Sequence, residues 1–282
     1  MPQSPMKIGI VAPGSRLDPD VAPKVEQLAK TLYPERTPEL HFHPQCFLTW
    51  GHFAGEDSAR AESFLEIAND PGYDALWFGR GGYGACRLAE PVLAGLSEAA
   101  RDKLYLGYSD AGTLLAALYT RGFAALAHGP MPADINRRGG EAAVTRALAY
   151  LVARDPAVLE ANVAAEAPTA AFNITILSQL IGTPWQPDLT GHVLQLEEVS
   201  EYMYRIDRSL CHITSNTGIR QAAGLRLGRC SLIPDNDPDF GQDEEQVIRH
   251  WCGVSGLPYL GRADIGHDVD NKVVPFGPLP TG

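Results

Sequence analysis

The chain has 282 residues, of which 45% are apolar, and it carries a formal net charge of −11. This length is sufficient for one large or two medium domains, and the negative charge disfavours nucleic acid and anionic membrane surfaces as partners. The five cysteines have no CxxC spacing, so the sequence suggests neither a disulfide framework nor a zinc knuckle, and reduced thiols in a cytoplasm fit best.

Short apolar runs alternate with helical patterns through the first half of the chain. The first run, IGIVA at residues 8–12, is too short for a signal peptide, and no run reaches transmembrane length, so we expect a cytoplasmic protein. Asp20 is placed to cap the helix that follows. The predicted strands are residues 8–12, 39–47, 73–78, 104–108 and 123–127, and the predicted helices are residues 21–32, 59–69, 85–93, 111–118 and 141–153.

This alternation predicts an α/β fold, with a parallel sheet covered by helices on both faces and ligands bound beyond the carboxyl ends of its strands. After an Ala/Pro/Glu-rich stretch, the pattern changes. It predicts strands at 192–199 and 222–227, helices at 204–213 and 244–251, and two final strand-like runs. We therefore predict an N-terminal α/β domain over 1–154, a linker over 155–171 and a smaller, mixed α/β domain over 172–282.

The segment LYLGYSDAGTLLAAL, residues 104–118, places a serine at the corner between a predicted strand and a predicted helix. Its small neighbours Gly107 and Ala111 allow a sharp turn that holds the Ser109 hydroxyl beyond the sheet edge, as in a nucleophile elbow. The free amide of Asp110, at the start of the helix, is a candidate oxyanion donor. The alternative is that Ser109 or Asp110 only caps the helix.

Four glycines follow the third predicted strand in LWFGRGGYGACRL, at positions 79, 81, 82 and 84. Glycine permits positive φ and close backbone approach, so the amides of Gly81 and Gly82 can turn toward a ligand. The loop lacks the Lys-Ser/Thr pair of a P-loop, and an oxyanion loop beside the serine suits it better than a phosphate cradle. A glycine-rich turn without a ligand is the alternative.

A serine nucleophile needs a base within hydrogen-bond reach, and the base needs an orienting partner. His267 follows Gly266 in a predicted loop, where its imidazole can project freely, and it is the leading candidate. His128, after the fifth predicted strand, is either a second candidate base or a buried support. His41 and His43 share a strand face, as metal ligands can, but no third ligand is evident.

For the orienting acid, Glu197 and Glu198 end an alternating strand in HVLQLEEV. Because alternate residues share a face, Glu197 lies on the side of Gln195, whereas Glu198 lies on the side of Leu194 and Leu196. The polar side is the better pocket wall, which favours Glu197. The alternative is that both glutamates belong to a solvated strand end.

Four motifs occur in a fixed order along the chain: GRGGYG, GYSD, LEEV followed by YRIDRSL, and GHDVDNKVVPFG. Together, from IGIVAPGS to VVPFG, they resemble the LD-carboxypeptidase family of serine peptidases, which includes muramoyltetrapeptide carboxypeptidases and microcin C immunity peptidases. The resemblance implies a flavodoxin-like N-terminal lobe and a smaller C-terminal lobe. It also implies a homodimer without metal or cofactor, a triad of Ser109, Glu197 and His267, and an oxyanion hole from the amide of Asp110 and an amide of the Arg80-Gly81-Gly82 loop.

Members of this family remove the terminal D-alanine of murein tetrapeptides in cytoplasmic cell-wall recycling, so the resemblance implies a small peptide substrate. Arg80 or Arg262 could bind its free carboxylate, and Trp185 could stack on it or pack between the lobes. Residues 171–173 read Ala-Phe-Asn where the family usually has Gly-Gly-Asn, which adds bulk near the expected cleft. Two alternatives stay open: a microcin C immunity-type peptidase that cleaves an aspartyl-nucleotide-like amide, and a flavodoxin-like binding module without catalysis.

Overall fold

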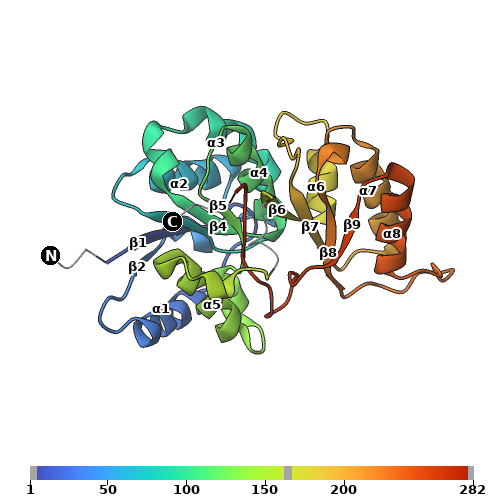
Figure 1. Ribbon diagram of the computed structural model, residues 1–282. Coiled ribbons are helices and arrows are strands. Elements are labelled where there is room, and N and C mark those ends of the chain that lie inside the picture. Colours follow the sequence, from blue (N-terminus) through green and yellow to red (C-terminus); the bar gives the residue numbers. More distant parts are fainter. Residues whose placement is uncertain (1–4, 162–166, 279–282) are drawn as a thin grey trace.

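The first half of the chain builds a six-stranded sheet in the computed structural model, which describes residues 5–161 and 167–278 (Figure 1). Five strands are parallel, and the sixth, β10, returns from the end of the chain and pairs antiparallel with β5. The spatial order is β10-β5-β4-β3-β1-β2. The strands are β1 (Lys7–Val11), β2 (Glu39–Phe42), β3 (Ala75–Phe78), β4 (Leu104–Gly107), β5 (Leu126–His128) and β10 (Val274–Pro275).

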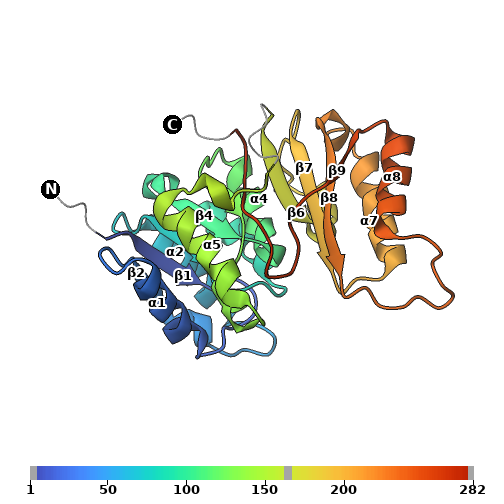
Figure 2. The same cartoon turned by 60° about the horizontal axis from the view of Figure 1, so that its bottom comes forward.

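Helices cover both faces of this sheet. Two of them pack on one face and three on the other, and each face has its own apolar core (Figures 1 and 2). β3 and β4 are buried along their whole length, as expected for strands covered on both sides. The first face carries α1 (Val21–Leu32) and α5 (Gly140–Ala153); the second carries α2 (Asp57–Asn69), α3 (Ala89–Gly95) and α4 (Gly112–Thr120).

The second half of the chain forms a separate, four-stranded parallel sheet in the order β6-β7-β8-β9. Figure 2 shows α7 and α8 on the side of this sheet that faces away from the first sheet. Contacts of α4 with α6, and of β10 with β6, join the two halves. The elements are β6 (Thr169–Asn173), α6 (Ile174–Leu180), β7 (Val193–Val199), α7 (Met203–Ser215), β8 (Gly224–Ser231), α8 (Glu244–Ser255) and β9 (Tyr259–Arg262).

The predicted α/β class, with its parallel sheet between two helical layers, is confirmed. Three local predictions are wrong. The strand predicted over 39–47 ends at Phe42, because Pro44, which has no N–H for a sheet ladder, begins a 3₁₀ turn. The helix predicted over 85–93 is a 3₁₀ turn followed by α3, since Pro91 fits only the first turn of a helix. Asp20 makes no capping bond, and its carboxylate binds Lys24 and Asn136 instead.

Two elements differ from the predicted layout of the second half. β6 begins at Thr169, inside the stretch predicted to be a linker, and α6 follows it directly. β10 belongs to the first sheet, although the sequence placed it with the second domain. Residues 162–166 of the predicted linker lie outside the described residues.

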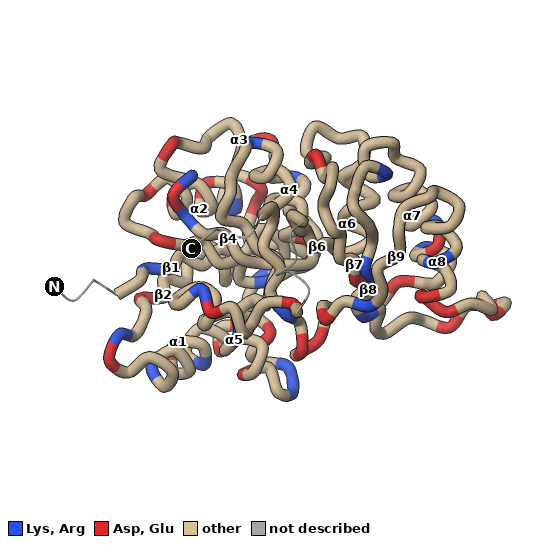
Figure 3. Tube along the Cα trace, viewed as in Figure 1, with Lys and Arg blue, Asp and Glu red and all other residues tan. Residues whose placement is uncertain are grey.

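Charged residues of both signs are spread over both halves of the molecule (Figure 3). Over the described residues, no helix combines the length and the apolar character that crossing a bilayer requires.

Candidate active site

The corner after β4 holds Ser109 in an unusual backbone conformation. Its φ is +62°, a value that residues with a side chain rarely adopt and that costs roughly 1–3 kcal/mol. Gly107 lets the backbone just before this corner lie close to Phe78, because a Cβ at position 107 would lie 2.6 Å from the Phe78 side chain. Asp110 and Ala111, in the 3₁₀ turn that leads into α4, are buried. The turn therefore fixes the hydroxyl at the carboxyl end of the sheet, where the sequence predicted it.

Three predicted side chains meet at this corner, although long stretches of sequence separate them. Nε2 of His267 lies 2.9 Å from Oγ of Ser109, and Nδ1 of His267 lies 2.5 Å from Oε2 of Glu197. Glu197 is fully buried on β7, and His267 is 8% exposed. The imidazole thus bridges a hydroxyl and a carboxylate in the geometry of a nucleophile, base and orienting acid.

The protonation of His267 reflects opposing effects. Burial by itself lowers the pKa of this imidazole, but the charge of Glu197 and its hydrogen bond more than offset burial, so the pKa lies above the usual 6.5. The ring of Tyr108 packs against the imidazole with 4.9 Å between centroids, which limits the rotation of His267.

His128, the second candidate base, occupies a different position. It is buried at the end of β5, and its Nε2 lies 3.3 Å from Oδ1 of Asn271 rather than beside Ser109. Burial lowers the pKa of His128 to about 4, so the ring is neutral at pH 7. It packs edge-on against Tyr108 and supports the ring that contacts His267.

The two adjacent glutamates of β7 have separate environments. Glu198 accepts hydrogen bonds from Nδ2 of Asn173, from the amide and hydroxyl of Thr175, and from the amide of Val199. These bonds hold the start of α6 next to β7. The carboxylate of Glu198 is thereby committed to the fold, whereas that of Glu197 faces the imidazole.

The glycine loop, residues 79–84, lies directly against the nucleophile corner. A Cβ on Gly81 would be 2.9 Å from both Cβ and Oγ of Ser109. The carboxylate of Asp110 accepts a 2.7 Å hydrogen bond from the amide of Ala85, just after the loop. Arg60, buried on α2, donates to the carbonyl oxygen of Gly84 at 3.1 Å. The loop is therefore held from both sides with its backbone close to the serine hydroxyl.

Residues 264–271, which we call the histidine loop, are held by arginines from both halves of the molecule. Arg229, at the end of β8, binds Asp264 at 2.5 Å and forms two bonds with the carboxylate of Asp268. From the other half, Arg137 donates to the carbonyl oxygen of His267. Ion pairs within the second half and a hydrogen bond from Arg137 of the first half thus hold the loop that places the imidazole over the serine.

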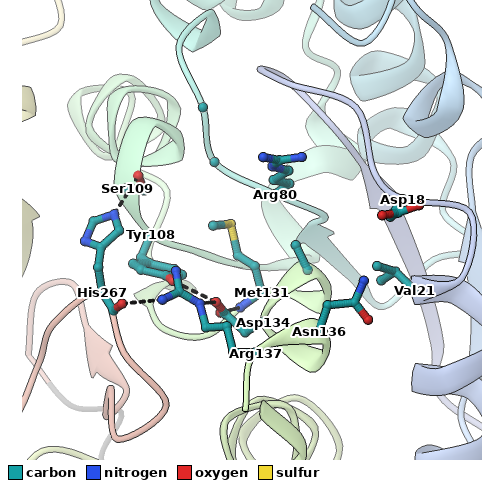
Figure 4. A pocket seen from close by; sticks show the side chains of 13 residues that line it. Asp18, Val21, Arg80, Tyr108, Ser109, Met131, Asp134, Asn136, Arg137 and His267 are labelled. Carbon is teal, nitrogen blue, oxygen red and sulfur yellow. Dashed lines mark hydrogen bonds and ion pairs between the residues drawn. The ribbon is translucent and has the colours of Figure 1, made fainter. Parts of the chain in front are cut away.

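Ser109 and His267 open onto a cleft of about 410 Å³ (Figure 4). Arg80 lines this cleft; it donates to the carbonyl oxygen of Arg16 at 3.0 Å and has no ion-pair partner among the described residues. Arg137 lies on the opposite wall, where Asp134 accepts from both Arg137 and Tyr108 at 2.9 Å. The cleft therefore offers one guanidinium without a carboxylate partner.

Other predicted residues lie elsewhere. Arg262 pairs with Glu244 at 3.1 Å on α8, and Trp185 packs against the apolar core rather than lining the cleft. Ala171 and Phe172 are buried in β6, and Phe172 packs against Phe276. The bulk that replaces the family glycines therefore fills the contact between the two halves of the molecule. His43 binds Glu66, and no group of three metal-binding side chains occurs in residues 5–161 and 167–278.

Comparison with known proteins finds matches over most of the chain. The family model described as the LD-carboxypeptidase N-terminal domain matches residues 8–129, and the model of the C-terminal domain matches residues 166–279. A Synechocystis protein assigned as a carboxypeptidase is 31% identical over 238 residues, which cover 81% of this chain and 76% of that protein. The chain belongs to the LD-carboxypeptidase family. It is accordingly a serine carboxypeptidase.

More distant LD-carboxypeptidases extend the similarity over almost the whole chain. The murein tetrapeptide carboxypeptidase of Pseudomonas aeruginosa is 25% identical, over 96% of this chain and 91% of that protein. The crystal structure of a muramoyltetrapeptide carboxypeptidase from Oxalobacter formigenes has a TM-score of 0.78 at 24% identity, covering 95% of this chain and 93% of that one. The microcin C7 self-immunity protein MccF, in complex with glutamyl sulfamoyl guanosine, has a TM-score of 0.79 at 15% identity, with coverages of 98% and 92%. The similarity to these two solved structures shows the fold alone.

Several residues that support the site in this LD-carboxypeptidase were missed by sequence reasoning. Arg229 and Arg137 were not singled out, and neither was Gly228, where a Cβ would lie 3.0 Å from Cβ of Glu197. One signal was available: Asp264 and Asp268 flank His267, and acids around a buried histidine need cationic partners. The sequence does not indicate which of its arginines those are.

Proposed function

We propose that this LD-carboxypeptidase hydrolyses the amide bond that joins a terminal D-alanine to the preceding L-centre of a murein tetrapeptide. Ser109 is the nucleophile, His267 the general base and Glu197 the orienting acid. The observation that carries this proposal is the continuous chain of hydrogen bonds from Ser109 through His267 to Glu197.

The first step forms a bond between Oγ of Ser109 and the carbonyl carbon, while Nε2 of His267 takes the hydroxyl proton. Glu197 stabilises the resulting imidazolium and fixes the tautomer that leaves Nε2 free to accept. The C–N bond then breaks as His267 returns the proton to the leaving amine. Water, deprotonated in turn by His267, releases the acyl group from Ser109.

The tetrahedral intermediate carries a negative oxygen, which backbone amides stabilise. We assign this role to the amide of Asp110 and to an amide of Gly81 or Gly82. The support is the close approach of the glycine loop to Ser109 and the hydrogen bond between Asp110 and Ala85. One such donor typically contributes roughly 10²- to 10³-fold in turnover.

The leaving D-amino acid occupies the cleft shared by Ser109 and His267, because the histidine must reach the leaving nitrogen to protonate it. Arg80 then binds the free carboxylate of the D-amino acid. A guanidinium without an ion-pair partner among the described residues is suited to this task.

The experiment incubates the tetrapeptide with wild-type protein, Ser109→Ala and the remote control Ser97→Ala, and follows loss of D-alanine by mass spectrometry. We expect turnover by wild type and Ser97→Ala and none by Ser109→Ala. A tetrapeptide with a C-terminal carboxamide should react far more slowly, and Arg80→Gln should remove that difference. Intact tetrapeptide with folded wild-type protein would contradict the proposal.

Two further measurements on the same proteins test the alternative functions. Cleavage of aspartyl sulfamoyl adenosine, with the tetrapeptide left intact, would assign the site to a microcin C immunity-type reaction. Failure of a fluorophosphonate probe to label Ser109 in folded protein would favour a binding module without catalysis.

The proposal extends to the setting of the enzyme, by the family resemblance. We place the reaction in cytoplasmic recycling of cell-wall peptides and expect a homodimer. Light scattering on the purified protein measures the assembly, and a mass equal to one chain would contradict the dimer.

A further inference from the structure

Ser109 borders a second depression as well as the cleft. This depression, of about 230 Å³, is lined by Tyr83, Asp110 and the first turn of α6, and His267 is not part of its wall. A third depression, of about 420 Å³, shares Thr175, Gln179 and Glu201 with the second, so the two adjoin each other. The third runs between α6 and α7 to Arg205 and Arg208. We call the second and third depressions together the acyl groove.

The chemistry of the reaction assigns a direction to the acyl groove. The leaving amine must lie near Nε2 of His267, which lines the cleft on one side of Ser109. The acyl part stays bonded to Oγ of Ser109 after the amine departs and extends away from it. It therefore enters the acyl groove, on the side where His267 is absent from the wall.

Charges follow a fixed order along the acyl groove. Glu201 lines both depressions and is about one-fifth exposed; its Oε1 accepts a 3.1 Å hydrogen bond from the amide of Tyr202 and lies 3.6 Å from Nε of Arg205, a long distance for an ion pair. The other two carboxylates in the wall are occupied: that of Glu198 by Asn173 and Thr175, and that of Asp110 by the amide of Ala85. Going from Ser109, a substrate therefore first meets the carboxylate of Glu201, which has acceptor capacity beyond these two contacts.

Cationic groups come farther along. Arg208 has no ion-pair partner among the described residues, and its guanidinium lies 5.7 Å from the ring centroid of Tyr204. Arg205 is already committed in part to Glu201 and to the Tyr204 hydroxyl at 3.3 Å. Arg208 is thus the cation in the acyl groove that is most available to an anionic ligand.

We propose that the acyl groove binds a zwitterionic acyl chain, in which Glu201 accepts hydrogen bonds from a side-chain ammonium and Arg208 binds a carboxylate farther from the scissile bond. This assignment rests on the proposed function for the direction of the substrate. It makes Glu201 and Arg208 determinants of specificity, with no part in the bond-breaking step.

The test measures binding, so that turnover is not needed. In Ser109→Ala protein, dissociation constants are determined for tetrapeptides containing meso-diaminopimelate and for three single-group derivatives: one acetylated on the side-chain amine, one amidated on the side-chain carboxylate, and one with D-isoglutamine in place of D-glutamate. We expect about tenfold weaker binding on acetylation and on loss of one of the two carboxylates, as is typical of partly exposed charged hydrogen bonds.

Variants assign these losses to residues. Adding Arg208→Gln should abolish the difference between carboxylate and carboxamide peptides but preserve the effect of acetylation. Adding Glu201→Gln should do the reverse. Arg249→Gln and Glu62→Gln, two exposed positions outside the acyl groove, are the matched controls and should change neither ratio, and melting temperatures verify that every variant is folded.

The outcomes separate the two proposals. Wild-type hydrolysis without any effect of Arg208→Gln or Glu201→Gln on the ratios would overturn the acyl groove alone. Group-specific ratios that these variants erase, without hydrolysis by wild type, would uphold the acyl groove and overturn the proposed reaction. Equal binding of all four peptides by folded Ser109→Ala protein would overturn the acyl groove.

Discussion

The corner that carries Ser109 and the loop that carries His267 reach the same point by different physical means. The corner is held by short-range packing: Gly107 allows contact with Phe78, and Gly81 lies against the serine itself. The histidine loop is held by arginines that lie far from it in the sequence: Arg229 pairs with Asp264, and Arg137 donates to the carbonyl oxygen of His267. The comparison indicates that the nucleophile is positioned by sterics and the base by electrostatics.

The largest expected effect comes from removing the charge behind the base. Glu197→Gln keeps the size of the side chain but loses the stabilisation of the imidazolium and of its tautomer. We expect turnover to fall by roughly 10³- to 10⁴-fold, as for the equivalent change in other serine hydrolases. Steady-state kinetics on the tetrapeptide measures this, and a decrease of less than tenfold would contradict the role of Glu197.

The pH profile sharpens that result. His267 must be neutral to accept a proton, so kcat/KM of wild type should fall as the pH decreases through a value above 6.5, the direction in which Glu197 moves the pKa of His267. In Glu197→Gln only burial and more distant charges remain, so the acidic limb of the residual activity should move to lower pH. An unchanged limb would mean that another group controls it.

Gly81→Ala tests whether close packing of the glycine loop positions the nucleophile corner. The new Cβ would lie 2.9 Å from Cβ and Oγ of Ser109, so the glycine loop must move away from the serine and take its amides with it. We expect turnover to fall by about 10²-fold with little change in the pH profile. Gly253→Ala, on α8 with open space around it, is the control and should be slightly more stable than wild type by about 0.5–1 kcal/mol. Equal activities of the two variants would contradict an oxyanion role for this loop.

The same contrast explains how much could be predicted from the sequence. Apolar periodicity and the small residues around Ser109 are local signals, so the parallel sheet and the corner followed from them. β10 could not be placed with the first sheet, because two residues paired with β5 carry no pattern of their own. Apart from the family resemblance, the choice of Glu197 over Glu198 rested on strand alternation. The contacts that distinguish them involve Asn173 and His267, which lie far away in sequence.

Arg229→Gln tests whether ion pairs position the histidine loop. A carboxamide can replace one hydrogen bond but not the paired contact with Asp268 or the charge that Asp264 faces, so the histidine loop should become less well positioned. Small displacements of a reacting group can cost up to about 10²-fold, and we expect a decrease of roughly 10-fold in kcat with KM nearly unchanged. Arg249→Gln, on the surface of α8, serves as control. A change in KM alone would indicate that Arg229 affects substrate binding instead.

Asp110→Asn removes the carboxylate beside the nucleophile corner. We expect the variant to be more stable than wild type at pH 7 but less active. Burial raises the pKa of Asp110 to about 6, even though the amides of Ala85 and Gly84 stabilise its charge. The folded protein therefore binds this proton more tightly than the unfolded chain, so stability decreases as the pH rises from about 4 to about 6. At pH 7 the ionised carboxylate costs on the order of 3 kcal/mol.

An asparagine never ionises, so Asp110→Asn should be more stable than wild type at pH 7 and nearly equal to it at pH 4, as measured by urea unfolding. Its neutral oxygen accepts the Ala85 amide more weakly, and the glycine loop should relax, so kcat should fall by about 3- to 10-fold. A merely structural carboxylate would lower stability and activity together when replaced. Greater stability with lower activity would mean that the ionised Asp110 is retained for the position of the loop beside Ser109.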